Sequence, residues 1–125
     1  MGYPIRYLTA DSAALSTSYA TFDLGPAPES AYASGLKLLI TGASTTGQVV
    51  TVFLSTDSGG DEGVTLRVPK ALEYGKTTAT DAWVVLDIDR PLIVGEGPVS
   101  LYCHVALSAG TATGCVPYLA VQDLP

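Results

Sequence analysis

Both cysteines and the only histidine of this 125-residue chain fall in one stretch near its C-terminal end, between residues 98 and 121. Cys103 and His104 are adjacent, and Cys115 follows after a turn-rich segment of Ser, Gly, Thr and Ala. Thiolate and imidazole groups bind metal ions and serve as nucleophile and base, so this stretch is where chemistry would be expected first.

The same stretch reads as two apolar strands, Pro98–Leu107 and Cys115–Val121, and predicts a β-hairpin. If Cys103 faces Cys115, the turn centres on Ala109. Such a pair could form a disulfide, but cross-strand bridges are often strained, and a chain made in a reducing cytosol keeps its thiols reduced. We therefore expect two free, buried thiols that pack as small hydrophobic groups, with a disulfide as the alternative.

His104 lies on the opposite strand face from its neighbour Cys103, because successive residues of a strand point to opposite sides. A zinc site needs three or four ligands, and a Cys–His nucleophilic pair needs direct contact. Because Cys103 and His104 point to opposite faces of the strand, we expect neither arrangement. We expect a surface or interface histidine bonded to a neighbour, and we assign no catalytic residue, no metal ligand and no cofactor.

Two acidic sets are the remaining candidates for chemistry. The loop Asp57–Glu62 offers carboxylates to calcium, but its spacing departs from that of a calcium loop. Asp87 and Asp89, near Trp83, could suggest glycoside hydrolysis, yet positions i and i+2 on an outward strand face are the usual solvent pattern. Neither set predicts an enzyme, and the chain is expected to be non-enzymatic.

Composition narrows the function classes further. Hydrophobic residues make up 47% of the chain and charged residues 14%, and twelve acidic residues against six basic ones give a net charge of −6. The basic residues do not cluster, so no patch is available to neutralise phosphates, and nucleic acid is excluded as a partner. The N-terminus lacks signal-peptide features and no apolar run approaches the roughly 20 residues of a membrane span. We expect a soluble chain, made in a cytosol, with no membrane partner.

Short β-prone runs separated by Gly, Pro, Asp and Ser dominate the sequence and predict an all-β fold. A helical turn is expected only at residues 29–34, where Gly35 would stop it, and a central hairpin is expected at 36–55. The expected strands are 4–9, 19–24, 36–41, 48–55, 64–68, 82–89, 98–107 and 115–121. Eight such strands favour a jelly-roll-like, eight-stranded β-sandwich over a seven-stranded immunoglobulin-like one. We predict a single domain, 1–125, with residues 1–9 as an N-terminal arm or edge strand and 123–125 as a tail.

Two groups of exposed apolar residues are candidate contact surfaces. In the strand 82–89, Val84, Leu86 and Ile88 alternate inward, which leaves Trp83 and Val85 on the polar side. A neighbouring loop, a protein interface or a stacked sugar could each account for the outward tryptophan. On the N-terminal segment, Tyr3, Ile5 and Tyr7 suit docking onto a neighbouring subunit.

The chain resembles tailed-bacteriophage virion proteins, in particular the decoration or cement proteins that bind the outside of a capsid. The segments that carry this resemblance are residues 1–7 (MGYPIRY), 18–25 (SYATFDLG) and 108–114 (SAGTATG). The resemblance implies a jelly-roll-like virion structural protein, commonly a homotrimer, that binds the major capsid protein on the capsid surface and stabilises the shell. The alternative is a carbohydrate-binding β-sandwich of a phage tail or host-recognition device, using Trp83 and the acidic loops.

Overall fold

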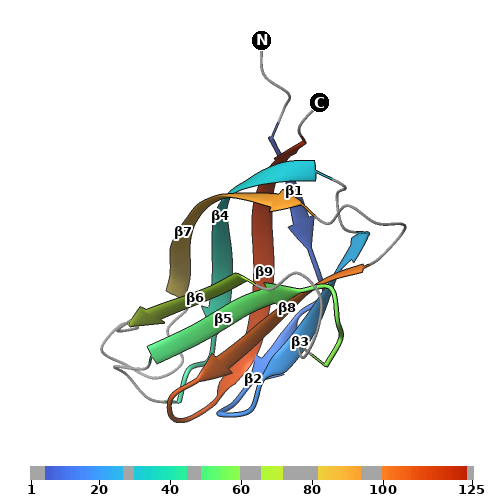
Figure 1. Cartoon of the computed structure of the whole chain (residues 1–125). Coiled ribbons are helices and arrows are strands. Elements are labelled where there is room, and N and C mark those ends of the chain that lie inside the picture. The colour runs from blue at the N-terminus through green and yellow to red at the C-terminus, as the bar shows by residue number, and fades with distance from the viewer. Residues whose placement is uncertain are drawn as a thin grey trace.

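Two antiparallel β-sheets pack face to face to form the protein (Figure 1). The computed structural model describes residues 5–26, 30–44, 49–59, 66–71, 82–93 and 100–123. The strands in these ranges are β1 (Ile5–Thr9), β2 (Ala13–Leu15), β3 (Ala20–Pro26), β4 (Ser30–Thr41), β5 (Val49–Ser55), β6 (Leu66–Ala71), β7 (Ala82–Ile93), β8 (Ser100–Leu107) and β9 (Ala112–Asp123).

The five-stranded sheet has the order β1-β9-β4-β7, with β2 also paired to β9, and the four-stranded sheet has the order β3-β8-β5-β6. Since β1 and β2 pair with successive parts of β9, they form one interrupted edge strand, and the sandwich has eight strand positions. The pairs are nested, β1 and β2 with β9, β3 with β8, β4 with β7, and β5 with β6. This nesting is the jelly-roll wrap, so the predicted eight-stranded β-sandwich is confirmed.

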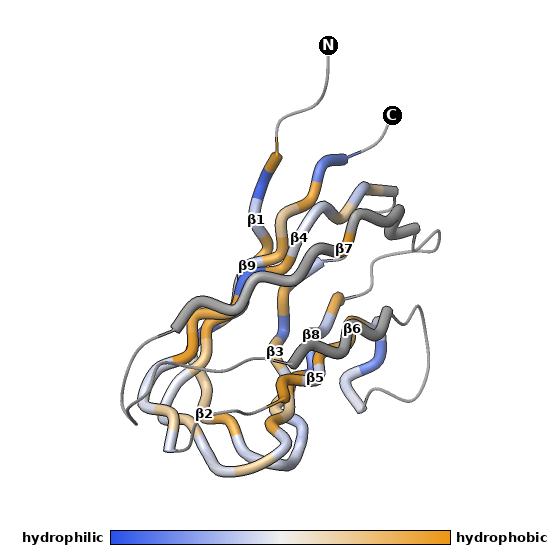
Figure 2. The backbone as a smooth tube through the Cα atoms, turned by 90° about the vertical axis from the view of Figure 1, so that its left-hand side faces the viewer, coloured by the Kyte–Doolittle hydropathy of each residue, from blue (hydrophilic) through white to orange (hydrophobic). Residues whose placement is uncertain are grey.

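The core lies between the sheets and is built by strand alternation. On β5, Val50, Val52 and Leu54 are buried, whereas Val49 is exposed on the opposite face. Alternate residues are buried in the same way on β4 (Leu36, Leu38 and Ile40) and on β8 (Leu101, Cys103, Val105 and Leu107). Figure 2 shows the two layers from the side, with β4 in one layer and β5 and β8 in the other.

Both predicted hairpins are wrong, although their strands exist. β4 and β5 lie in different sheets, and so do β8 and β9. The Gly-, Ser- and Thr-rich segments between them carry the chain from one sheet to the other. Gly42, just after β4, has a positive φ of 64°, and a Cβ there would collide with Thr113, so this crossing requires glycine. The prediction that β4 and β5 are central holds, because each has a strand on both sides.

The helical turn predicted at residues 29–34 is also wrong. Ala31 and Ala33 are fully buried and Tyr32 and Ser34 are half-buried, which is the two-residue period of a strand. β4 pairs with both β7 and β9 here. The register of β4 shifts on both sides between Ala33 and Gly35, so Ser34 lies in a β-bulge. Gly35, which the sequence suggested as a helix stop, belongs to this bulge.

Several strand boundaries differ from prediction. β6 and β7 run through Pro69 and Pro91, which were expected to end their strands; both strands lie at sheet edges, where a missing N–H is tolerated. β2 forms within the segment 10–18, where no strand was predicted. Asp123, expected in a tail, is the last residue of β9.

Candidate docking surface and the buried histidine

His104 lies at the centre of the outer face of the four-stranded sheet. Its Nδ1 is 3.0 Å from Thr21 Oγ1 on β3, and its Nε2 is 2.9 Å from Ser55 Oγ on β5. Because Ser55 Oγ donates to the Asp57 carbonyl oxygen at 2.7 Å, it accepts from Nε2–H, and Thr21 then donates to Nδ1. In a neutral ring, this arrangement places the proton on Nε2.

Aromatic side chains cover this imidazole. The Phe53 ring stacks on His104, with centroids 4.4 Å apart, and Tyr19 packs edge-on against Phe53 at 5.1 Å. His104 is 2% exposed. The predicted strand face and the hydrogen-bonded neighbour are confirmed, but the expectation of a surface or interface histidine is wrong, because the ring is buried.

The Ser55–His104 pair has the distance of a nucleophile and its base, but it lacks the other requirements. Ser55 is fully buried, and its hydroxyl proton is committed to a backbone carbonyl. Thr21 occupies the place on Nδ1 where a carboxylate would orient the ring. The arrangement locks three strands together and gives a substrate no access to Oγ.

The two cysteines lie on the inner faces of different sheets. Cys103 is opposite Phe22 and Leu54 in register, and Cys115 is opposite Ile40. Both thiols are free and buried, as predicted, whereas the predicted pairing of Cys103 with Cys115 within one sheet is wrong. Burial raises the pKa of both thiols, that of Cys115 to about 12, so neither is a thiolate at neutral pH.

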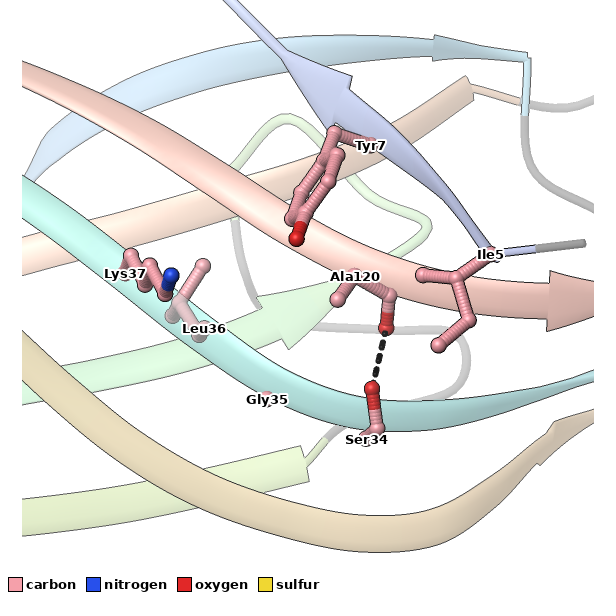
Figure 3. Close-up of a pocket in the computed structure, with 7 residues that line it drawn as sticks. All are labelled: Ile5, Tyr7, Ser34, Gly35, Leu36, Lys37 and Ala120. Carbon is pink, nitrogen blue, oxygen red and sulfur yellow. Dashed lines mark hydrogen bonds between the residues drawn. The ribbon is translucent and has the colours of Figure 1, made fainter.

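The outer face of the five-stranded sheet is hollowed where β1, β9 and β4 run side by side (Figure 3). In register, Tyr7 on β1 lies opposite Ala120 on β9, which in turn lies opposite Gly35 on β4. The side chains in this row thus decrease in size from tyrosine to alanine to glycine. A hollow of about 240 Å³ results, lined by Ile5, Tyr7, Ser34, Gly35, Leu36, Lys37 and Ala120; we call it the β1–β9–β4 hollow.

The rim of this hollow is apolar on one side and cationic on the other. Ile5 and Tyr7 are 57% and 55% exposed, more than any other large hydrophobic residue in the described ranges. Lys37, across from them, is exposed and makes no ion pair within those ranges. Ser34 Oγ donates to the Ala120 carbonyl oxygen at the floor, at a long 3.5 Å.

Four of the five predicted interface residues lie on strands of one sheet. Ile5 and Tyr7 are on edge strand β1, and the backbone of the opposite edge strand, β7, sets Trp83 opposite Leu39 and Val85 opposite Lys37. Tyr3 lies outside the described residues, and the side chains of Trp83 and Val85 are not described. The sequence missed Gly35, Ala120 and Lys37, since nothing marked them as neighbours before the pairing of β1, β9 and β4 was known.

Other expected features fall partly outside the described ranges. The acidic loop is described only as far as Gly59, and the side chains of Asp87 and Asp89 are not described. Within the described residues, no three His, Cys, Asp or Glu side chains group as metal ligands. No helix in those ranges is long and apolar enough to cross a membrane.

Comparison with solved structures places the fold among viral capsid chains. A chain of the cyanophage Pam1 capsid asymmetric unit aligns with a TM-score of 0.53 at 17% identity, over 99% of this chain and 87% of that chain. This likeness supports the jelly-roll assignment and, at such low identity, concerns the fold alone.

Two more distant matches are also viral particles. A chain of infectious bursal disease virus, Gx strain, aligns with a TM-score of 0.48 at 16% identity over 96% of this chain, which spans 32% of that chain. A chain of the extra small virus particle of the prawn Macrobrachium rosenbergii aligns with a TM-score of 0.40 at 13% identity, over 100% and 82% of the two chains. No protein-family model and no curated protein sequence matches this chain.

Proposed function

We propose that this protein is a non-enzymatic structural component of a virion, a decoration or cement protein that binds the outer surface of a capsid and stabilises the shell. The observation that carries the proposal is an open, apolar hollow on the outer face of a jelly-roll sandwich. The similarity of that sandwich to a chain of the Pam1 capsid asymmetric unit supports a virion context.

The hollow is the proposed contact with the major capsid protein. Ile5 and Tyr7 expose more than half of their surface, and burial of such side chains contributes to binding in proportion to the apolar area removed from water. A ligand that binds only the folded, assembled shell stabilises it by mass action. We further propose that the protein is a homotrimer, which would present several copies of the hollow at once and raise the overall affinity.

The test is sedimentation of the purified protein with shells assembled from the capsid protein of the same virus. We expect the protein to pellet with the shells and to raise their melting temperature. A protein that stays in the supernatant at micromolar concentration contradicts the decoration role. Light scattering on the free protein tests the trimer, since a mass equal to one chain would contradict it.

A matched pair of tyrosines locates the contact. Tyr7 and Tyr19 are 55% and 47% exposed, and they lie on the outer faces of different sheets. Tyr7→Ala is expected to weaken shell binding at least about tenfold, as loss of an aromatic anchor does, whereas Tyr19→Ala should leave it within about twofold. Equal losses in the two variants would place the contact elsewhere.

A further inference from the structure

We propose that the β1–β9–β4 hollow recognises a polypeptide segment in which an apolar or aromatic side chain is adjacent to a carboxylate, the ring or branched chain entering the hollow and the carboxylate pairing with Lys37. This inference rests on the proposed function, because it names the feature of the capsid protein that the hollow binds.

The size and lining of the hollow favour a single side chain as its occupant. Its volume of about 240 Å³ lies below the range of roughly 300–1,000 Å³ that is usual for small-molecule pockets. The floor of Ala120 and Gly35 is flat and small, and the walls of Ile5 and Tyr7 are apolar (Figure 3). An aromatic or branched side chain fills such a site and removes both exposed walls from water.

Lys37 supplies the specificity for charge. It lies in the middle of a central strand, between Leu36 and Leu38, which are fully buried on the other face. The only other cation whose side chain is described, Arg6, is already paired with Asp123 at 2.8 Å. Lys37 therefore gives an otherwise acidic protein an available positive charge at the rim of its apolar hollow, and a partner's carboxylate beside the inserted side chain would neutralise it.

The bulge at Ser34 offers a place for the partner's backbone. Ser34 has no register partner on β9 or β7, and its hydroxyl holds the Ala120 carbonyl only at 3.5 Å. A peptide N–H or C=O lying over the hollow could replace this long hydrogen bond with a shorter one. Binding of a polypeptide would thus satisfy polar groups as well as apolar ones.

The first experiment selects short random peptides from a display library on the intact protein, with the Ala120→Leu variant as a counter-selection. Leu at this position fills the hollow from its floor, and its melting temperature shows whether the fold is kept. We expect a consensus of an aromatic or large apolar residue next to Asp or Glu, with loss of binding of at least about tenfold in the variant. A consensus without an acid, or peptides that bind Ala120→Leu equally well, would overturn the proposal.

The charge is tested with two variants that each lower the net charge by one unit. Lys37→Gln removes the cation at the hollow, and Thr17→Glu adds an exposed carboxylate away from it. The selected peptides should bind Lys37→Gln about two- to fivefold more weakly, as for an exposed ion pair, and this difference should shrink in high salt. An equal effect of Thr17→Glu would show only general repulsion and would contradict the pairing.

Capsid shells separate this inference from the proposed function. If the wild-type protein binds shells and Ala120→Leu binds them equally, the decoration role stands and the hollow is not the contact. If the wild type binds no shells but selects the expected peptides, the recognition chemistry stands and the decoration role fails. Self-association of the free protein that Ala120→Leu abolishes would identify a second copy as the occupant and overturn the proposal.

Discussion

The two outer faces of the sandwich both carry aromatic side chains, but Phe53 is buried on one face and Tyr7 is exposed on the other. On the four-stranded sheet, Phe53 and His104 point outward and are nonetheless 5% and 2% exposed. On the five-stranded sheet, Ile5 and Tyr7 point outward and remain more than half exposed. An apolar side chain on an outer face is therefore not by itself a contact surface.

The size of the side chains on the central strands explains why one face is buried and the other exposed. On the four-stranded sheet the central position is His104, which is large enough for Phe53 to stack on and polar enough to bond strands on both sides. On the five-stranded sheet the corresponding row is completed by Ala120 and Gly35, which leave Tyr7 without a ring to pack on. The first face buries Phe53 and His104, and the second leaves Ile5 and Tyr7 more than half exposed.

The largest expected effect on stability comes from removing the Phe53 ring from the outer face of the four-stranded sheet. Phe53→Ala should lower the free energy of unfolding by about 3–5 kcal/mol, because it removes a buried ring that packs on both His104 and Tyr19. Tyr7→Ala should cost less than about 1 kcal/mol, because its ring is half in solvent. Urea unfolding measures both, and similar losses would contradict the contrast between the faces.

A smaller loss is expected from the hydroxyl that anchors the histidine. Ser55→Ala removes three hydrogen bonds at a fully buried position: one with His104 Nε2, one to the Asp57 carbonyl and a long one from the Asp57 N–H. The cost should be about 1–3 kcal/mol. Ser58→Ala, at an exposed position in the following turn, is the matched control and should be silent. A neutral Ser55→Ala would mean that stacking alone holds the ring.

The smallest effect concerns the ion pair that anchors β1 beside the hollow. The Arg6 guanidinium bonds Asp123 and lowers the pKa of that carboxyl below its usual value. A lowered folded-state pKa stabilises the fold above the unfolded pKa, near 3.9, and this contribution disappears as the pH falls through the folded-state value. Both groups are about half exposed, so the pair is worth under about 1 kcal/mol.

The measurement is urea unfolding of Arg6→Gln beside wild type at neutral and acidic pH. The variant should be slightly less stable at pH 7, and the difference should shrink as the pH falls and Asp123 becomes protonated in both proteins. A difference that grows on acidification would contradict the assigned pair.

Strand faces could be predicted from the sequence, and strand partners could not. Alternation correctly placed Ile88 inward and His104 on the opposite strand face from Cys103. Alternation says which side a residue faces, but it does not say to which sheet the strand belongs. A Gly- and Ser-rich turn serves a hairpin or a crossing between sheets equally well, and both hairpins therefore failed.

The hollow was beyond sequence reasoning for a related reason. Its floor requires Tyr7, Gly35 and Ala120 to fall into one row, although they are far apart in the chain. The bulge that helps to form it was hidden as well, since Gly35 after an Ala-rich segment suggested the end of a helix. Ile5 and Tyr7 were expected at an interface from their types alone, and that remains a prediction.

The position of β9 has a consequence for synthesis. Among the described strands β9 is synthesised last, yet it inserts between β1, which is synthesised before the others, and β4. Long-range pairing of this kind forms late in folding. A nascent or truncated chain accordingly has Tyr7 and Gly35 but no Ala120 between them, and offers a partner no finished site. Recognition through the hollow would be restricted to chains that have completed their fold.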